Sequence, residues 1–387
     1  MPGPSDGPAF PAYDERGLAG VLPRVAASLG VALDGYVGDL PPARRAVVVL
    51  VDGLGLELLR ARSGHAPFLR RLLRRQQEAP DPIAERLTAG FPATTATSMG
   101  SFGTGLPPGS HGLVGYQVRV PGTDRLLNEL SWQDGPVPEQ WQPEATWFQR
   151  ADRAGVAVTM IAPGKFDGSG LTRAALRGAR FKGAEPLGER VDLALAALRA
   201  DPRALAYLYW GDVDRIGHRY GCGSWQWGDA VEEVDRELQR LADGLPAGTS
   251  LTITADHGMV DVAADARVDL AHDPELAEGV LLAGGEMRAL QLYCRAGAAA
   301  DVLTTWRHRF GSQAWVLSRD EAVQAGLFGP VHERVLPRLG DVVVAMRAPI
   351  GVYDSRVMAR SVTTLIGQHG SLTDAEQSVP MLHVPVS

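Results

Sequence analysis

Seven side chains, spread over about 320 positions of this sequence, form a set that is suited to bind divalent cations. They comprise three carboxylates, three imidazoles and one hydroxyl, namely Asp52, Thr95, Asp214, His218, Asp256, His257 and His369. Carboxylate and imidazole ligands without thiolates suit Zn²⁺ and Mn²⁺, and this number of ligands is enough for two ions. A hydroxyl bound to such an ion loses its proton more readily than a free one, which would make Thr95 a nucleophile. The set predicts metal-assisted phosphoryl transfer through a covalent intermediate.

Two of the acidic residues follow runs that are typical of buried parallel strands. Asp52 comes directly after Ala46–Val51, and Asp256 follows Ser250–Thr254. Open α/β sheets bind ligands at the carboxyl ends of their strands, so both carboxylates are expected at one edge of a sheet. Helix capping is the alternative for Asp52, because Asp is also favoured just before the first turn of a helix.

Three histidines have settings that favour metal binding. His218 comes four residues after Asp214, so on a helical turn the two side chains share a face and could chelate one cation. His257 follows Asp256 directly, and the glycine after it permits the sharp turn that would aim both at one ion. His369 lies in the sequence Gly-Gln-His-Gly. Taken singly, the alternatives are a surface Asp–His pair and a histidine in an ordinary turn.

The segment that contains Thr95, residues 91–112 (FPATTATSMGSFGTGLPPGSHG), is rich in hydroxyl side chains. A helix that begins within it would direct its free backbone N–H groups at an anion. A Ser/Thr-rich turn that caps a helix is the ordinary alternative.

Strands and helices alternate along the first two thirds of the chain, which predicts an α/β fold with a doubly wound, mostly parallel sheet. Further buried strands are expected at Val156–Ile161 and Ala204–Tyr209, with a short C-terminal strand near Met381–Val384. Helices are expected at 22–33, 54–73, 190–200 and 230–242.

The pattern changes after Val260, and residues 265–350 contain shorter apolar runs, as at 289–293, 314–317 and 341–345. We therefore expect a catalytic core of residues 1–264 and 351–387 and an inserted α+β lobe of residues 265–350. Because this insertion lies in the chain between His257 and His369, we expect the lobe to emerge beside the metals and cover the site.

The composition excludes several classes of partner. The chain has 387 residues, 45% of them apolar, and a formal net charge of −7, so it carries no electrostatic footprint for duplex nucleic acid or an anionic membrane. No segment reads as a signal peptide or as a membrane span, and two cysteines indicate no disulfide framework. These features predict a cytoplasmic protein with a small-molecule partner, and no element indicates its oligomeric state.

Taken together and in this order, the motifs resemble the alkaline phosphatase superfamily and, within it, the nucleotide pyrophosphatase/phosphodiesterase branch. The matching sequences are VDG at 51–53, FPATT at 91–95, TGLPPGSHG at 104–112, DRIGH at 214–218, DHGM at 256–259 and GQHG at 367–370. The resemblance covers roughly residues 46–375 and implies an alkaline phosphatase-like core with two divalent metal ions, Zn²⁺ or Mn²⁺.

The resemblance also implies a role for each residue. One metal would be held by Asp52, Thr95, Asp256 and His257, and the other by Asp214, His218 and His369. Thr95 would attack phosphorus to give a phospho-threonine intermediate, which water at the second metal would hydrolyse.

Two positions depart from the family pattern. An asparagine that binds a phosphate oxygen often follows the nucleophile by three residues, and Ser98 occupies that position here. An aromatic residue for base stacking often follows the nucleophile directly, and Ala96 occupies that position. We expect any stacking to come from other rings, such as Trp141, Trp147, Phe148, Trp225 or Trp227.

The expected substrates are nucleotide phosphodiesters. The Ala-, Gly-, Pro- and Arg-rich composition is typical of actinobacterial coding, and the chain looks similar to actinobacterial phosphodiesterases that degrade cyclic di-AMP and linear di-AMP to AMP. The alternatives are a nucleotide pyrophosphatase, a phosphonoacetate-type phosphonate hydrolase and a non-enzymatic metal-stabilised binding module.

Overall fold

A seven-stranded sheet forms the centre of the computed structural model, which describes residues 8–14, 16–31, 38–78 and 86–384. Its strand order is β2-β17-β8-β1-β7-β5-β6. Five neighbouring strands are parallel, namely β8 (Thr249–Thr254), β1 (Arg45–Val51), β7 (Ala204–Trp210), β5 (Ala157–Ala162) and β6 (Arg180–Gly183). The prediction of an α/β, mostly parallel sheet is therefore confirmed.

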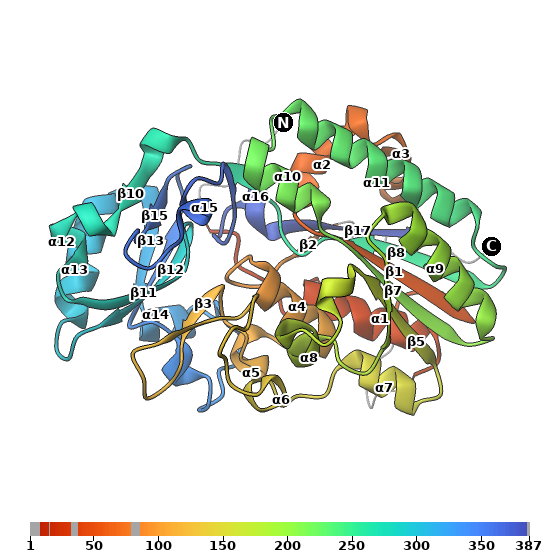
Figure 1. The fold of residues 1–387 in the computed structure, drawn as a ribbon, viewed down its shortest axis with the longest axis horizontal. Coiled ribbons are helices and arrows are strands. Elements are labelled where there is room, and N and C mark those ends of the chain that lie inside the picture. The colour runs from red at the N-terminus through yellow and green to blue at the C-terminus, as the bar shows by residue number, and fades with distance from the viewer. Residues whose placement is uncertain (1–7, 15, 32–37, 79–85, 385–387) are drawn as a thin grey trace.

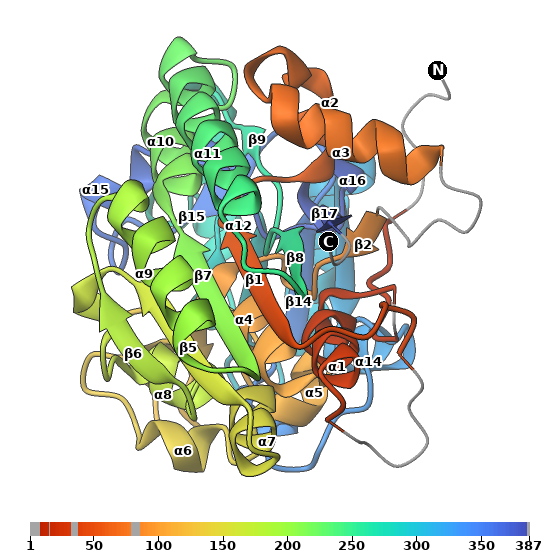
Figure 2. The same ribbon diagram turned by 90° about the vertical axis from the view of Figure 1, so that its right-hand side faces the viewer.

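The central strands are apolar along their whole length because helices cover both faces of the sheet. One face carries α2 (Leu56–Ala61), α3 (Pro67–Gln77), α9 (Leu187–Ala200) and α11 (Trp225–Asp243) (Figures 1 and 2). The other carries α1 (Val21–Ser28), α4 (Thr95–Thr104), α7 (Trp147–Arg153) and α8 (Gly170–Ala175). Every residue of β1 after Arg45 is buried, as is every residue of β8.

Two expected helices differ from the structure. The helix expected over 54–73 is divided into α2 and α3, because the Ser63–His65 turn interrupts it and Pro67 starts a new helix. The helix expected over 22–33 ends as α1 at Ser28, and residues 32–33 of that prediction lie outside the described residues.

The last strand, β17 (Ser378–Val384), is longer than expected and does not extend the parallel order. It lies between β8 and β2 (Arg86–Thr88) and runs antiparallel to both. The short apolar run at 381–384 predicted a strand but neither its direction nor its neighbours.

A second, antiparallel sheet of four strands is formed by residues 280–346, and it lies at the left in Figure 1. Its order is β11 (Val280–Glu286), β12 (Ala289–Cys294), β14 (Val342–Met346) and β13 (Ala314–Ser318). One part of it packs with α13 (Ala299–Phe310) in a separate apolar cluster around Trp306, while residues such as Val343 join the main core. The division of the chain at residues 265 and 350 stays a prediction.

A buried ion pair ties this second sheet to the core. Arg288, in the turn between β11 and β12, donates to both carboxylate oxygens of Glu376 at 2.8 Å. Both side chains are almost fully buried, and Arg288 also donates to the backbone carbonyls of Met346, Ala348 and Ile350.

Among the described residues, no helix has both the length and the apolar character that crossing a membrane requires.

Candidate metal centre

Three adjacent strands deliver the acidic residues to one edge of the sheet. Val51, the last residue of β1, pairs with Trp210 of β7, and Leu50 pairs with Thr254 of β8. Asp52, Asp214 and Asp256 follow these three strand ends within four residues. The backbone N–H of Asp52 still donates to the carbonyl of Trp210 at 2.8 Å, so the first carboxylate emerges where the ladder ends.

A glycine lets the first of these turns approach the others closely. Gly53 has a φ of +73°, and a side chain there would place its Cβ 2.9 Å from the Cα of Asp214. The Gly53 N–H donates to Oδ1 of Asp256 at 3.1 Å. The Asp-Gly pair after β1 is therefore required both for the turn and for the orientation of Asp256.

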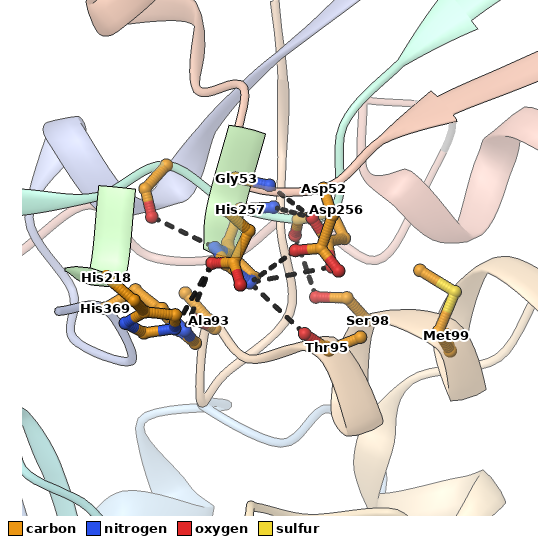
Figure 3. Close-up of polar contacts among 12 residues, drawn as sticks. Asp52, Gly53, Ala93, Thr95, Ser98, Met99, His218, Asp256, His257 and His369 are labelled. Atoms are coloured by element: carbon orange, nitrogen blue, oxygen red, sulfur yellow. Dashed lines mark hydrogen bonds and ion pairs between the residues drawn. The ribbon is translucent and has the colours of Figure 1, made fainter. Parts of the chain in front are cut away.

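Thr95 is the first residue of α4, and it lies across from these turns (Figure 3). Thr94, which precedes the helix, is extended, so the chain turns sharply into the helix at Thr95. The half-buried Thr95 side chain places its Oγ1 3.4 Å from Nε2 of His257.

The seven predicted residues lie together in one cluster. Oxygen and nitrogen ligand atoms of Asp52, Asp256 and His257 all lie within 4.8 Å of one another. The same is true of Asp214, His257 and His369, and His218 Nε2 lies 3.3 Å from Oδ1 of Asp214. The structure therefore brings the two sets that the family resemblance implies side by side, with His257 close to both.

Each of the three histidines is held by a backbone carbonyl. Nδ1 of His218 lies 2.7 Å from the carbonyl of Gly367, Nδ1 of His257 lies 3.1 Å from that of Gly258, and Nδ1 of His369 lies 2.9 Å from that of Ala93. An Nδ1–H that donates to a carbonyl leaves Nε2 unprotonated and available to a metal, which is the usual arrangement of metal-binding histidines.

Among the described residues, no lysine or arginine is paired with the carboxylates of the cluster, whose only close basic neighbours are its own histidines. Asp52 Oδ1, Asp214 Oδ1 and Asp256 Oδ2 are buried and have no hydrogen-bond partner among the described residues. Burial, and then the neighbouring carboxylates of Asp256 and Asp214, raise the pKa of Asp52 well above its usual value. Burial also raises the pKa of Asp256. Divalent cations would satisfy these oxygens, so the residues fit a metal centre.

The cluster also disfavours the charged form of His369. Burial, and then His257 and His218, lower the pKa of His369 well below its usual value. The His257 and His369 rings are stacked with centroids 3.7 Å apart. Neutral imidazoles are the form that ligates metals, so this setting agrees with a ligand role.

Ser98 does not face the cluster's open side. It is fully buried in α4, and its hydroxyl donates to the backbone carbonyl of Asp256 at 2.8 Å. This hydrogen bond holds α4 against the Asp256 turn. A direct contact between Ser98 and substrate stays a prediction.

An open cleft of about 1200 Å³ lies over the cluster, and its lining includes Thr95, Asp52, Asp214 and His218. Its aromatic lining is Tyr116, Phe166 and Tyr209. The rings expected from the sequence to stack on a base do not line it, because Trp141, Trp147, Phe148 and Trp227 are buried in the core and Trp225 is 70% exposed elsewhere. That expectation is wrong.

Two residues of the site were not identified from the sequence. Tyr209 lies in β7, and its hydroxyl donates to Oδ2 of Asp52 at 2.5 Å. Glu286 ends β11 of the second sheet, where it is buried against Gly370, and neither of its carboxylate oxygens has a hydrogen-bond partner among the described residues. Tyr209 looked like any core residue of an apolar strand, and no sequence signal relates Glu286 to residues 94 and 370.

Comparison with known proteins agrees with the family resemblance of the sequence motifs. Residues 46–372 match the family model of type I phosphodiesterase/nucleotide pyrophosphatase. Ectonucleotide pyrophosphatase/phosphodiesterase family member 7 of Rattus norvegicus is 27% identical over 197 residues, which are 46% of this chain and 43% of that protein. Venom phosphodiesterase 2 of Crotalus adamanteus is 28% identical over 196 residues, 47% of this chain and 23% of that protein. The matches thus span less than half the length of these curated relatives.

Two solved structures share the fold. Murine ectonucleotide pyrophosphatase/phosphodiesterase 5 superposes with a TM-score of 0.68 at 18% identity, over 87% of each chain. Phosphonoacetate hydrolase from Sinorhizobium meliloti, solved with phosphonoacetate, superposes with a TM-score of 0.66 at 19% identity, over 89% of this chain and 91% of that one.

Proposed function

The chain belongs to the type I phosphodiesterase/nucleotide pyrophosphatase family, and on that premise we propose that it is a two-metal phosphodiesterase that cleaves nucleotides through a phospho-threonine intermediate. Asp52, Thr95, Asp256 and His257 would hold one ion, and Asp214, His218 and His369 the other. When bound, such ions neutralise phosphate charge and lower the pKa of a bound hydroxyl or water.

The observation that carries this proposal is the position of Thr95. Its Oγ1 lies 3.4 Å from Nε2 of His257. Thr95 is the first residue of a ten-residue helix and lines the cleft. The N–H groups of the first turn of α4 are directed toward the space where a phosphate oxygen would lie. The Tyr209 hydroxyl orients Asp52 by donating to it, and Ser98 holds the helix against the Asp256 turn.

We further propose that the substrate is a dinucleotide, with cyclic di-AMP and linear di-AMP as the first candidates. A cleft of about 1200 Å³ is larger than a mononucleotide requires, and Tyr116, Phe166 and Tyr209 offer planar rings to bases. An inactive threonine-to-alanine variant of murine ectonucleotide pyrophosphatase/phosphodiesterase 5 has been solved in complex with AMP, which supports an adenine nucleotide as ligand.

A phosphonate hydrolase is the second candidate, and Lys165 favours it. Lys165 lines the cleft, and its ammonium lies over the Phe166 ring 5.0 Å from the centroid. An ammonium beside a two-metal centre could bind the carboxylate of a small phosphonate, which is the kind of ligand present in the structurally similar hydrolase.

The lobe of residues 265–350 would contribute substrate selection. Glu286 packs beside Gly370 and Thr94, each adjacent in sequence to a proposed metal ligand, so this sheet adjoins the carboxyl edge where the site lies.

A turnover panel with metal-loaded protein tests the proposal. The panel compares cyclic di-AMP, linear di-AMP, a dinucleoside polyphosphate, a p-nitrophenyl phosphodiester and phosphonoacetate. We expect release of AMP from the dinucleotides. Acetate release from phosphonoacetate without any dinucleotide cleavage would reject the nucleotide assignment and leave the metal chemistry standing.

The nucleophile is tested by Thr95→Ala with Thr94→Ala as its neighbouring control. We expect Thr95→Ala to lose turnover by at least a factor of about 1,000 while keeping its metal content, because the carboxylate and imidazole ligands remain. Loss of turnover in Thr94→Ala together with an active Thr95→Ala would move the nucleophile by one residue.

A further inference from the structure

A second, basic pocket adjoins the cleft and takes no part in the chemistry described so far. Its volume is about 440 Å³, and it is lined by Ala264, Arg267, Tyr353, Ser355, Met358, Arg360, Thr363 and Thr364. The lining includes two guanidinium groups and several hydroxyls. No carboxylate is among the described residues that line it, so its charge favours an anion.

Hydrogen bonds hold the Arg267 side chain in place but leave one of its N–H donors without an acceptor among the described residues. Its two terminal nitrogens donate to the backbone carbonyls of Thr363 at 2.7 Å and Val262 at 2.8 Å. Its Nε is buried and has no hydrogen-bond partner among the described residues. Buried donors are nearly always paired, so this N–H indicates an acceptor that comes from a ligand or solvent.

Arg360 is the second cation of the pocket, and it is exposed. No ion pair or hydrogen bond engages its guanidinium within the part of the chain that the structure describes. Nearby Arg356 differs, because its guanidinium is paired with the carboxylate of Asp354 at 2.7 Å. Arg360 is thus available to an incoming anion, and Arg356, four residues earlier in the chain, provides a matched control.

The pocket is separated from the metal cleft by a single turn of helix, α15 (Arg360–Thr363). Ser361 and Leu365 line the cleft, Arg360 and Thr363 line the basic pocket, and Thr364 lines both. Ile366, two residues farther on, donates its N–H to the carbonyl of His218 at 2.6 Å. Two residues of chain span at most about 7 Å, so Thr364 lies close to the backbone of a proposed metal ligand.

We propose that this pocket, with Arg267 and Arg360 as its cations, binds a second phosphate of the substrate while the scissile phosphate lies at the metal centre. This inference rests on the proposed phosphodiesterase function and narrows it to nucleotide diesters that carry two phosphates. A guanidinium matches the geometry of phosphate oxygens, and a distal charge contact discriminates such substrates from diesters with one phosphate. It also supplies local positive charge to a protein whose net charge is −7.

The test compares two substrates that differ by one phosphate. Linear di-AMP with a terminal 5′-phosphate has two phosphates, and the dinucleoside monophosphate ApA has one. For Arg360→Ala we expect KM for the first to rise about tenfold, as for the loss of one charge-assisted hydrogen bond, with kcat unchanged. We expect no change for ApA, and none for either substrate in Arg356→Ala.

An equal effect of Arg360→Ala on both substrates, or no effect on either, would overturn the proposal. Wild-type protein that cleaves neither substrate would instead reject the proposed function. In that case calorimetry on the Thr95→Ala background decides the pocket separately. A tenfold loss of affinity for the two-phosphate compound on adding Arg360→Ala would support it, and an unchanged affinity would overturn it.

Inorganic phosphate distinguishes a substrate subsite from a site for free phosphate. If the pocket binds the second phosphate of the substrate, millimolar phosphate should raise KM for the two-phosphate compound more than for ApA. Arg360→Ala should remove that difference. Arg360-dependent binding of phosphate, with equal KM values for the two substrates in wild-type protein, would reject the substrate role.

Discussion

Glu286 provides the sharpest test of how the second sheet meets the site. The side chain is 8% exposed, and burial raises its pKa from 4.5 to about 8. The Thr94 hydroxyl lowers the pKa, while the carboxylates of Glu376 and Glu129 raise it further. The carboxyl should therefore be protonated in the folded protein at neutral pH and ionised in the unfolded chain.

The sign of the pH effect follows from this difference. An acid whose pKa is raised by folding stabilises the fold below its unfolded pKa, and that stability is lost as the pH rises through the folded pKa. With an unfolded pKa of 4.5 and a folded pKa of about 8, Glu286 lowers the free energy of unfolding by about 3 kcal/mol more at pH 7.5 than at pH 5. This is an upper limit, because any rearrangement that hydrates the carboxylate reduces it.

The perturbation is Glu286→Gln, which removes the titration and keeps the shape. We expect the free energy of unfolding of the variant, relative to that of wild type, to rise by about 3 kcal/mol between pH 5 and pH 7.5. The measurement is urea unfolding with EDTA present throughout. Any pH-independent effect of the amide cancels in this comparison. As control, Glu321→Gln removes an exposed carboxylate whose pKa Arg307 lowers to about 2, so it should change stability slightly and with the opposite sign. A difference between variant and wild type that is the same at both pH values would refute the reasoning.

Three further outcomes follow from the site and its supports. Asp214→Asn should reduce the bound metal from two ions per chain to one, measured by elemental analysis after dialysis, and unchanged content would contradict the two-site assignment. Removal of metal with EDTA should destabilise the protein by about 2.7 kcal/mol for each site that is filled at 100 times its Kd, and an unchanged Tm would contradict metal binding by the folded state. Arg288→Met should lower the free energy of unfolding by about 3–5 kcal/mol, because it leaves Glu376 buried and unpaired. Arg307→Ala, which breaks an exposed pair, should lower it by less than about 1 kcal/mol. Equal losses of stability in chemical denaturation would refute this.

The parallel core could be predicted because its strands are buried on both faces. Runs such as Ala46–Val51 and Ala204–Tyr209 are apolar throughout, and the structure extends them by only one residue as β1 and β7. Local chemistry then placed the acidic residues at the strand ends, since parallel strands end at a common edge. The position of β17 could not be predicted, because pairing between β17 and β8 joins segments more than 120 residues apart and leaves no local pattern.

The same limit explains what was missed at the site. Tyr209 of β7 contacts Asp52 at the end of the neighbouring strand β1, and Glu286 of the second sheet lies near Thr94, which precedes α4, so neither contact has a sequence spacing that could reveal it. The tryptophans show the opposite error. Trp147 and Trp227 lie near motifs in the sequence, but their large apolar surface is satisfied by burial in the core, which is the usual fate of such rings.

The internal position of β17 has a consequence for how the chain matures. Until β17 pairs, β8 presents an unpaired strand edge, and β2 has no partner in the main sheet. Such an edge can pair with another chain during synthesis, when residues 249–254 have emerged and residues 378–384 have not. Closing the sheet therefore depends on contacts made late, which slows folding and lengthens the time for which β8 is exposed.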